Sequence, residues 1–169
     1  FASTMPKGRP LRGALLQPNC GALLARILPL LTAQGADLAV IDSDPTVLSF
    51  VDAGLQARPA EVRLSMHNVD MSGLRPVVIG TELDVVVVDG LVDSLPSRQL
   101  GVLLSAVRSS LVEGGRLVMT AMSPSRDARL MEHVLRWPML RRTPKEWTSM
   151  LKAVGFDSIV EPKSNQKDH

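Results

Sequence analysis

Two acidic residues stand where two runs of β-forming residues end. Residues 39–41 lead directly into Asp42, and the apolar run 83–88 leads into Asp89 and Gly90. Ligands of an open parallel sheet bind at the carboxyl ends of its strands. A carboxylate in that position can accept hydrogen bonds from sugar hydroxyls or face the positive end of a ligand. The two acids therefore predict a site for a nucleotide-type cofactor.

The elements that would position these acids alternate between strands and helices. Apolar runs and period-two patterns predict strands over residues 11–17, 37–41, 61–70, 83–88, 116–120 and 156–160. Helical spacing predicts helices over residues 20–32, 45–53, 97–111, 127–137 and 144–153. This alternation is typical of an α/β domain with three layers, a parallel sheet and right-handed crossovers.

Two of the helix starts have a specific capping signal. Asp44 precedes Pro45, so its carboxylate can cap the helix while proline suits the first helical position. Residues 143–146, with the sequence TPKE, form a capping box. Because capping explains Asp44 fully, we expect a structural role there. We also expect Asp93 to cap the helix that follows it, with a position facing an acceptor molecule as the alternative.

Composition excludes several classes of function. The formal net charge is only +2, aromatic residues make up 3% and Tyr is absent, which argues against a nucleic-acid binder. The single cysteine, Cys20, forms no intrachain disulfide and favours a reducing, cytoplasmic compartment. No Cys/His cluster has metal-ligand spacing, so we expect no metal. No apolar run reaches the roughly 20 residues of a membrane span.

The length of 169 residues suits one domain, which we place at residues 11–161. Residues 1–10 are expected to be a linker or disordered lead-in, and residues 162–169 a loose tail. Position 1 is Phe, so we expect the chain to be part of a longer polypeptide. A basic stretch that comprises Arg136, Arg141, Arg142 and Lys145 is expected to be a solvated face, with contact to an acidic carrier domain or an anionic head group as the alternative.

The pieces in order resemble the class I S-adenosylmethionine-dependent methyltransferase fold from residue 11 to residue 160. The segments that match are AVIDSDPTVL, DVVVVDGLVDSLP, SSLVEGGRLVMTAMSPS and TPKEWTSMLKAVGFDSIVEP. A narrower similarity is to the methyltransferase-like group named for the extracellular-factor, 3-hydroxypalmitate methyl ester pathway. It rests on DGLVDSLPSRQLGVLL followed by PSRDARLMEHVLRWPMLRRTPKEW.

The resemblance implies S-adenosylmethionine as the cofactor, with Asp42 accepting hydrogen bonds from its ribose. Asp89 and Gly90 would lie beside its sulfonium, where an acid could balance the positive charge. From the residues alone, Asp42 could also be a solvated acid, and Asp89-Gly90 could be an ordinary turn.

Four further residues would complete the cofactor pocket by the same resemblance. Asp70 would meet the adenine amino group with Met71 beside it, although Asp70 could equally begin a Ser-Gly turn. Cys20 and Gly21 would line the methionine end, but a lone cysteine is more often an inert core residue.

The chain departs from the family pattern at two places. Its first loop, residues 17–22, is not glycine-rich, and Gln17 replaces the usual acid. Too little chain follows residue 160 for the usual last strand. We therefore expect a Rossmann-like, three-layer sandwich with a mostly parallel sheet that lacks the seventh strand. A partner domain or a homo-oligomer would then cover the edge of the sheet.

Two functions remain open on these grounds. The first is a methyltransferase domain that acts on a small or lipid-like acceptor, such as an acyl carboxylate. No catalytic base is evident, and methyl transfer to a carboxylate needs none. The alternative is a methyltransferase-like domain without catalysis, serving as a binding or assembly module of a longer protein.

Overall fold

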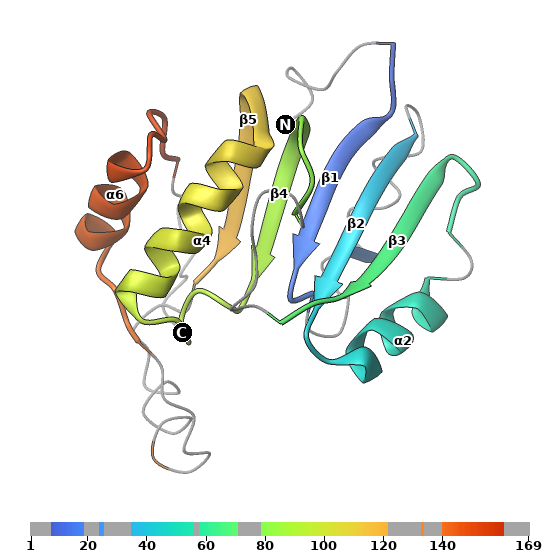
Figure 1. Ribbon diagram of the computed structural model, residues 1–169, viewed down its shortest axis with the longest axis horizontal. Helices are drawn as coiled ribbons and strands as arrows, with labels where there is room; N and C mark the ends of the chain where they lie inside the picture. The colour runs from blue at the N-terminus through green and yellow to red at the C-terminus, as the bar shows by residue number, and fades with distance from the viewer. Residues whose placement is uncertain are drawn as a thin grey trace, which may run out of the picture.

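The computed structural model describes residues 8–18, 24–25, 35–55, 58–70, 79–121, 133 and 140–160. Its centre is a five-stranded sheet in the order β3-β2-β1-β4-β5, and every neighbouring pair of strands is parallel (Figure 1). The elements are β1 (Leu11–Leu16), β2 (Ala36–Asp42), α2 (Pro45–Gly54), β3 (Val62–Asn68), β4 (Leu83–Asp89), α4 (Ser97–Ser110), β5 (Leu111–Thr120) and α6 (Pro144–Ala153).

Helices cover both faces of the sheet and give it two apolar cores. On one face, Leu48 of α2 is buried in a cluster with Val40 of β2. On the other face, Leu104 of α4 is buried with Val88 of β4, and Trp147 of α6 packs against the same cluster. Figure 1 shows α4 next to β5, α6 on the left of α4, and α2 near β2 and β3. The predicted three-layer α/β class is therefore confirmed.

Both predicted helix starts are confirmed by their hydrogen bonds. The Asp44 carboxylate accepts the Thr46 amide hydrogen at 2.7 Å, with Pro45 in the first turn of α2. At α6, the Glu146 carboxylate accepts from the Thr143 amide at 2.7 Å, and the Thr143 hydroxyl accepts from the Glu146 amide. These starts follow from local chemistry, which is why the sequence predicted them well.

The strand predicted over residues 156–160 is wrong. These residues are not part of the sheet, and the Phe156 amide instead donates to the Leu151 carbonyl at the end of α6. Gly155, at φ +90°, turns the chain back so that this bond can form. Phe156 and Ile159 then pack on the core beside α4. The apolar side chains of this segment therefore pack on the core, while its first amide, that of Phe156, is bonded to the end of α6 and not to a strand.

Strand β5 begins five residues earlier than predicted. Leu111 already pairs with Leu83, and the register shifts before Arg116 pairs with Val85. The shift falls at Gly114, whose φ is +73°, and Gly115, where a Cβ would lie 3.0 Å from the Leu83 carbonyl oxygen. The Gly-Gly pair is therefore an irregularity inside the strand and not a turn before it.

The helices predicted over residues 20–32 and 127–137 lie outside the described residues, except for residues 24, 25 and 133, which are helical. No helix among the described residues has both the length and the apolar character needed to cross a membrane.

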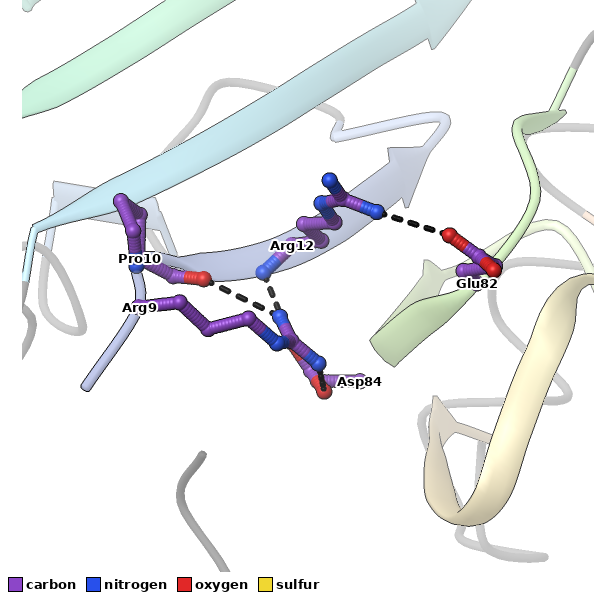
Figure 2. Close-up of polar contacts among 5 residues, drawn as sticks. All are labelled: Arg9, Pro10, Arg12, Glu82 and Asp84. Atoms are coloured by element: carbon purple, nitrogen blue, oxygen red, sulfur yellow. Dashed lines mark hydrogen bonds and ion pairs between the residues drawn. The ribbon is translucent and has the colours of Figure 1, made fainter. Parts of the chain in front are cut away.

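Ion pairs close the amino end of the sheet, where the strands begin. Arg9 forms two hydrogen bonds to the Asp84 carboxylate, at 2.7 and 2.8 Å, and the Arg12 amide adds a third at 2.9 Å (Figure 2). The Arg12 guanidinium pairs with Glu82 at 3.0 Å. These contacts join the segment before β1 to the start of β4.

Candidate functional site

The register of the sheet places the carboxyl ends of its strands at nearly the same level. Leu16 of β1 pairs with Ile41 of β2 and with Val88 of β4, so these three residues lie at one level. The next level holds Asp42 and Asp89. Their ladder partners extend this level to the outer strands, where Asp42 pairs with Asn68 and Asp89 with Thr120. We call this level the polar row: Asn68, Asp42, Gln17, Asp89 and Thr120.

The polar row begins where the apolar core ends. Leu16, Ile41 and Val88 are completely buried, and each is followed by a member of the polar row. Asp42 and Asp89 are separated by the one strand β1, a distance of about 10 Å between their strands. The two predicted acids therefore face one region above the end of β1.

Asp42 is fixed in place on both its side chain and its backbone. The residue is only 5% exposed, and its Oδ1 accepts the Asp44 amide hydrogen at 2.9 Å. Its carbonyl oxygen accepts from the Asn68 side-chain amide at 3.2 Å and from the Val69 amide at 3.0 Å. A buried carboxylate held in this way has one orientation before any ligand binds.

Asp89 and Gly90 are linked to β5 through one hydroxyl group. The Thr120 hydroxyl donates to Asp89 Oδ1 at 2.6 Å and accepts the Gly90 amide hydrogen at 2.9 Å. Gly90 has φ +74°, in the left-handed region that a residue with a Cβ adopts at a cost. The end of β4 thus presents a carboxylate next to a backbone without a side chain.

Gln17 also adopts a left-handed conformation, at φ +49°. Its amide donates to the Ile41 carbonyl at 2.9 Å, which continues the β1–β2 ladder beyond the end of the strand. Glu82, just before β4, has a similar conformation at φ +56°, so this backbone geometry alone does not mark a functional site. Gln17 belongs to the polar row because the β1–β2 ladder places it level with Asp42.

Asp44 is confirmed as a helix cap. Accepting the Thr46 amide hydrogen lowers the pKa of Asp44 below its usual value, so the carboxylate is charged at neutral pH. Asp70 is exposed and follows the end of β3 by two residues, which places it beyond the polar row. Cys20, Gly21 and Met71 lie outside the described residues.

The loop after β4 is held by a buried arginine. Arg142 is 9% exposed and donates to the carbonyl oxygens of Val92, at 2.9 Å, and Leu95, at 2.5 Å. Its guanidinium carbon lies 5.3 Å from the centre of the Trp147 ring. The predicted solvated face is therefore wrong for Arg142, although Arg141 and Lys145 are exposed. Five planar donors suit a turn that presents several carbonyl groups.

Asp93 lies in the same loop and does not cap α4. The N-cap of α4 is Pro96, with no side-chain hydrogen bond, and Asp93 is only 4% exposed. Its carbonyl oxygen accepts the Leu140 amide hydrogen at 2.6 Å. The loop after β4 and the segment before α6 are therefore tied together from both sides.

Sequence reasoning missed Asn68 and Thr120 as site residues. Each is a polar residue at the end of its strand, but neither is acidic, so residue type alone did not select it. The available signal was positional: both become visible once the strands are aligned by their pairing partners.

A shallow depression of about 620 Å³ lies at the other end of β3. Seven of the described residues line it: Asp52, Arg58, Pro59, Ala60, Val62, Arg63 and Leu64. Arg58 lies 3.6 Å from Asp52, and Arg63 pairs with Asp37. Because these charges are matched within the protein, the depression is a weaker candidate site than the polar row.

Comparison with known proteins shows similarity in structure. No protein-family model and no curated protein matches the sequence. The CurJ carbon methyltransferase matches with a TM-score of 0.73 over 96% of this chain, at 22% identity. The CMeT domain of the citrinin polyketide synthase gives 0.74 over 90%, at 14% identity. LepI, in a structure with S-adenosylmethionine, gives 0.66 over 91%, at 15% identity.

The chain shares the Rossmann-like α/β fold of these three structures. At these identities the similarity concerns the fold, and the narrower resemblance to the extracellular-factor group stays a prediction. The chain spans 46%, 42% and 39% of the lengths of the three matched structures. It therefore corresponds to less than half of each of them.

Proposed function

We propose that this chain is an S-adenosylmethionine-dependent methyltransferase domain whose cofactor binds at the polar row. The main support is the pair of acids at one level on either side of β1, with Asp42 buried and held in one orientation. The fold adds support, because the matched LepI structure is a complex with S-adenosylmethionine. Ligands of open α/β sheets bind at this end of the strands.

The residues of the polar row suit this cofactor. Asp42 Oδ1 accepts the Asp44 amide hydrogen. Oδ2 would then accept hydrogen bonds from the ribose hydroxyls. Asp89 would face the sulfonium, and Gly90 leaves the backbone accessible because it has no side chain. The remaining proposed cofactor residues are Cys20, Gly21, Asp70 and Met71.

Catalysis in this proposal depends mainly on positioning. The bound cofactor supplies an electrophilic methyl group on a positively charged sulfur. The polar row would hold the ribose and face the charge, and Arg142 fixes the loop that follows β4 next to it. Placing two reactants in line accounts for a large part of such a rate enhancement. For a small or lipid-like acceptor that carries a carboxylate, no residue has to remove a proton.

One observation favours the alternative, a binding or assembly module without catalysis. Among the described strands, β5 forms an edge of the sheet, and residues 156–160 do not pair with it. An open strand edge invites cover by a partner domain or by a second copy of the chain. In this alternative the polar row would be retained without turnover.

Calorimetric titration with S-adenosylhomocysteine tests the proposal. Asp42→Asn is the informative variant. Its side-chain oxygen can still accept the Asp44 amide hydrogen, but an NH2 donor replaces the second carboxylate oxygen. We expect the affinity to fall about tenfold or more, the value of a hydrogen bond to a charged group. Asp37→Asn is the matched control, since Asp37 lies on the same strand at the opposite end and pairs with Arg63. Its affinity should stay within about twofold.

The outcomes separate the two functions. Binding that weakens in Asp42→Asn but not in Asp37→Asn supports the methyltransferase site. Equal binding by the wild type and Asp42→Asn contradicts the assignment of the ribose to Asp42. If the wild type is folded by circular dichroism yet binds no cofactor, the methyltransferase proposal is wrong and the module becomes the better account.

A further inference from the structure

Thr120 connects the ends of β4 and β5 in the polar row. Its hydroxyl contacts the Asp89 carboxylate at 2.6 Å and the Gly90 amide at 2.9 Å. Asp89 and Thr120 are ladder partners on β4 and β5, so both side chains leave the same face of the sheet. One small side chain therefore holds the carboxylate and the following backbone group at once.

The direction of both hydrogen bonds is fixed by the groups involved. A backbone amide can only donate, so the Gly90 hydrogen must point to Thr120 Oγ1. The hydroxyl then uses its single proton as donor to Asp89 Oδ1, because an ionised carboxylate can only accept. With both bonds made, neither the hydroxyl nor the carboxylate can rotate freely.

Asp89 projects toward the same region as Asp42. The residues two positions earlier, Val87 and Val40, belong to the same buried cluster, so the side chains of Asp89 and Asp42 follow them on that face. The orientation that Thr120 gives to Asp89 therefore bears on whatever lies between the two acids.

We propose that Thr120 is a positioning residue that directs the Asp89 carboxylate at the cofactor sulfonium and so sets the preference for the charged cofactor over its neutral product. This inference rests on the proposed function. S-adenosylmethionine carries a positive charge on sulfur, and S-adenosylhomocysteine does not. A well-oriented carboxylate thus favours the first ligand, whereas the ribose contact of Asp42 is common to both.

The test compares the affinities of the two ligands by calorimetry in the wild type, Thr120→Val and Thr120→Ser. Valine keeps the shape of threonine and removes the hydroxyl, while serine keeps the hydroxyl. We expect the ratio of the two dissociation constants to shift about threefold to tenfold against S-adenosylmethionine in Thr120→Val. The affinity for S-adenosylhomocysteine should change little in Thr120→Val. Thr120→Ser should keep the wild-type ratio of the two dissociation constants. Thr120→Ala replaces Thr120→Val if the latter does not fold.

Each result has one meaning. The role of Thr120 is supported if the ratio of the two dissociation constants shifts in Thr120→Val and stays at the wild-type value in Thr120→Ser. An unchanged ratio overturns it, and so does an equal loss for both ligands, which would show that Thr120 only maintains the strand end. In these cases the wild type still binds, so the proposed function survives. A folded wild type that binds neither ligand overturns both proposals.

Discussion

The two ends of the sheet hold their acidic residues in different ways. At the amino end, Asp84 accepts two hydrogen bonds from Arg9 (Figure 2). Asp37 likewise accepts two hydrogen bonds from Arg63. At the carboxyl end, Asp42 accepts from a backbone amide and Asp89 from the Thr120 hydroxyl. Guanidinium groups neutralise the acids that they hold. The backbone amide that holds Asp42 fixes the orientation of this carboxylate without adding a positive charge.

This difference separates structure from function along the same strands. Asp37 and Asp42 both belong to β2, yet the first pairs with Arg63 across the surface and the second is buried in the polar row. Exposed ion pairs contribute little to stability. A buried carboxylate costs free energy unless hydrogen bonds or an opposite charge compensate it. We therefore expect substitution of Asp42 to weaken ligand binding and substitution of Asp37 to leave ligand binding unchanged.

The largest stability effect is expected for Arg142→Met. This change removes a buried guanidinium and leaves the carbonyl groups of Val92 and Leu95 without their donor. We expect a loss of about 2–4 kcal/mol in the free energy of unfolding, measured by urea denaturation. Arg9→Met is the control at the amino end, where the arginine side chain is 40% exposed, and it should cost less. Equal losses for the two variants would contradict the stronger structural role that burial gives to Arg142.

A moderate effect is expected for Asp84→Asn at the amino end. The side chain is 12% exposed and accepts from Arg9 and from the Arg12 amide, so weakening these bonds should lower the urea midpoint. The loss should be roughly half that of Arg142→Met or less, because the arginine partner is solvated. The affinity for S-adenosylhomocysteine should not change. A clear loss of affinity in this variant would break the separation between the ends.

The smallest effect concerns Glu146 in the capping box of α6, the helix that carries Trp147 beneath Arg142. Hydrogen bonds from the Thr143 amide and hydroxyl lower the pKa of Glu146 below its usual 4.5. A lowered pKa in the folded state adds stability above 4.5, and this stability is lost as the pH falls through the lowered value. Glu146→Gln keeps the capping bond and loses the titration.

Melting temperatures of the wild type and Glu146→Gln should therefore differ near neutral pH and converge in acid. A difference that persists unchanged as the pH falls well below 4.5 would contradict this assignment.

Local chemistry in the sequence predicted much of the fold. The Asp44 and Thr143 caps need only neighbouring residues, and the apolar run of β4 is recognisable because both faces of a central strand are buried. Residues 156–160 look like a strand by the same criteria, but a strand also needs a partner. The Phe156 amide instead donates to the Leu151 carbonyl at the end of α6, and the sequence does not reveal this bond.

The candidate site was predictable in part for a similar reason. Asp42 and Asp89 were selected because acids at strand ends are conspicuous, and the structure aligns them. Asn68 and Thr120 required the register of strands that are distant in the sequence. Arg142 resembled its exposed neighbours in type, and only the carbonyl groups of the loop after β4 explain its burial.

The central claim, that the cofactor binds at the carboxyl end of the sheet, is tested most directly by amide hydrogen exchange with and without S-adenosylhomocysteine. The account predicts slower exchange in residues 43–47 after β2 and residues 90–92 after β4. Exchange at the amino end, in residues 35–37 and 82–84, should not change. Protection at the amino end or around the depression beside Arg58 and Arg63, without protection at the carboxyl end, would contradict the claim.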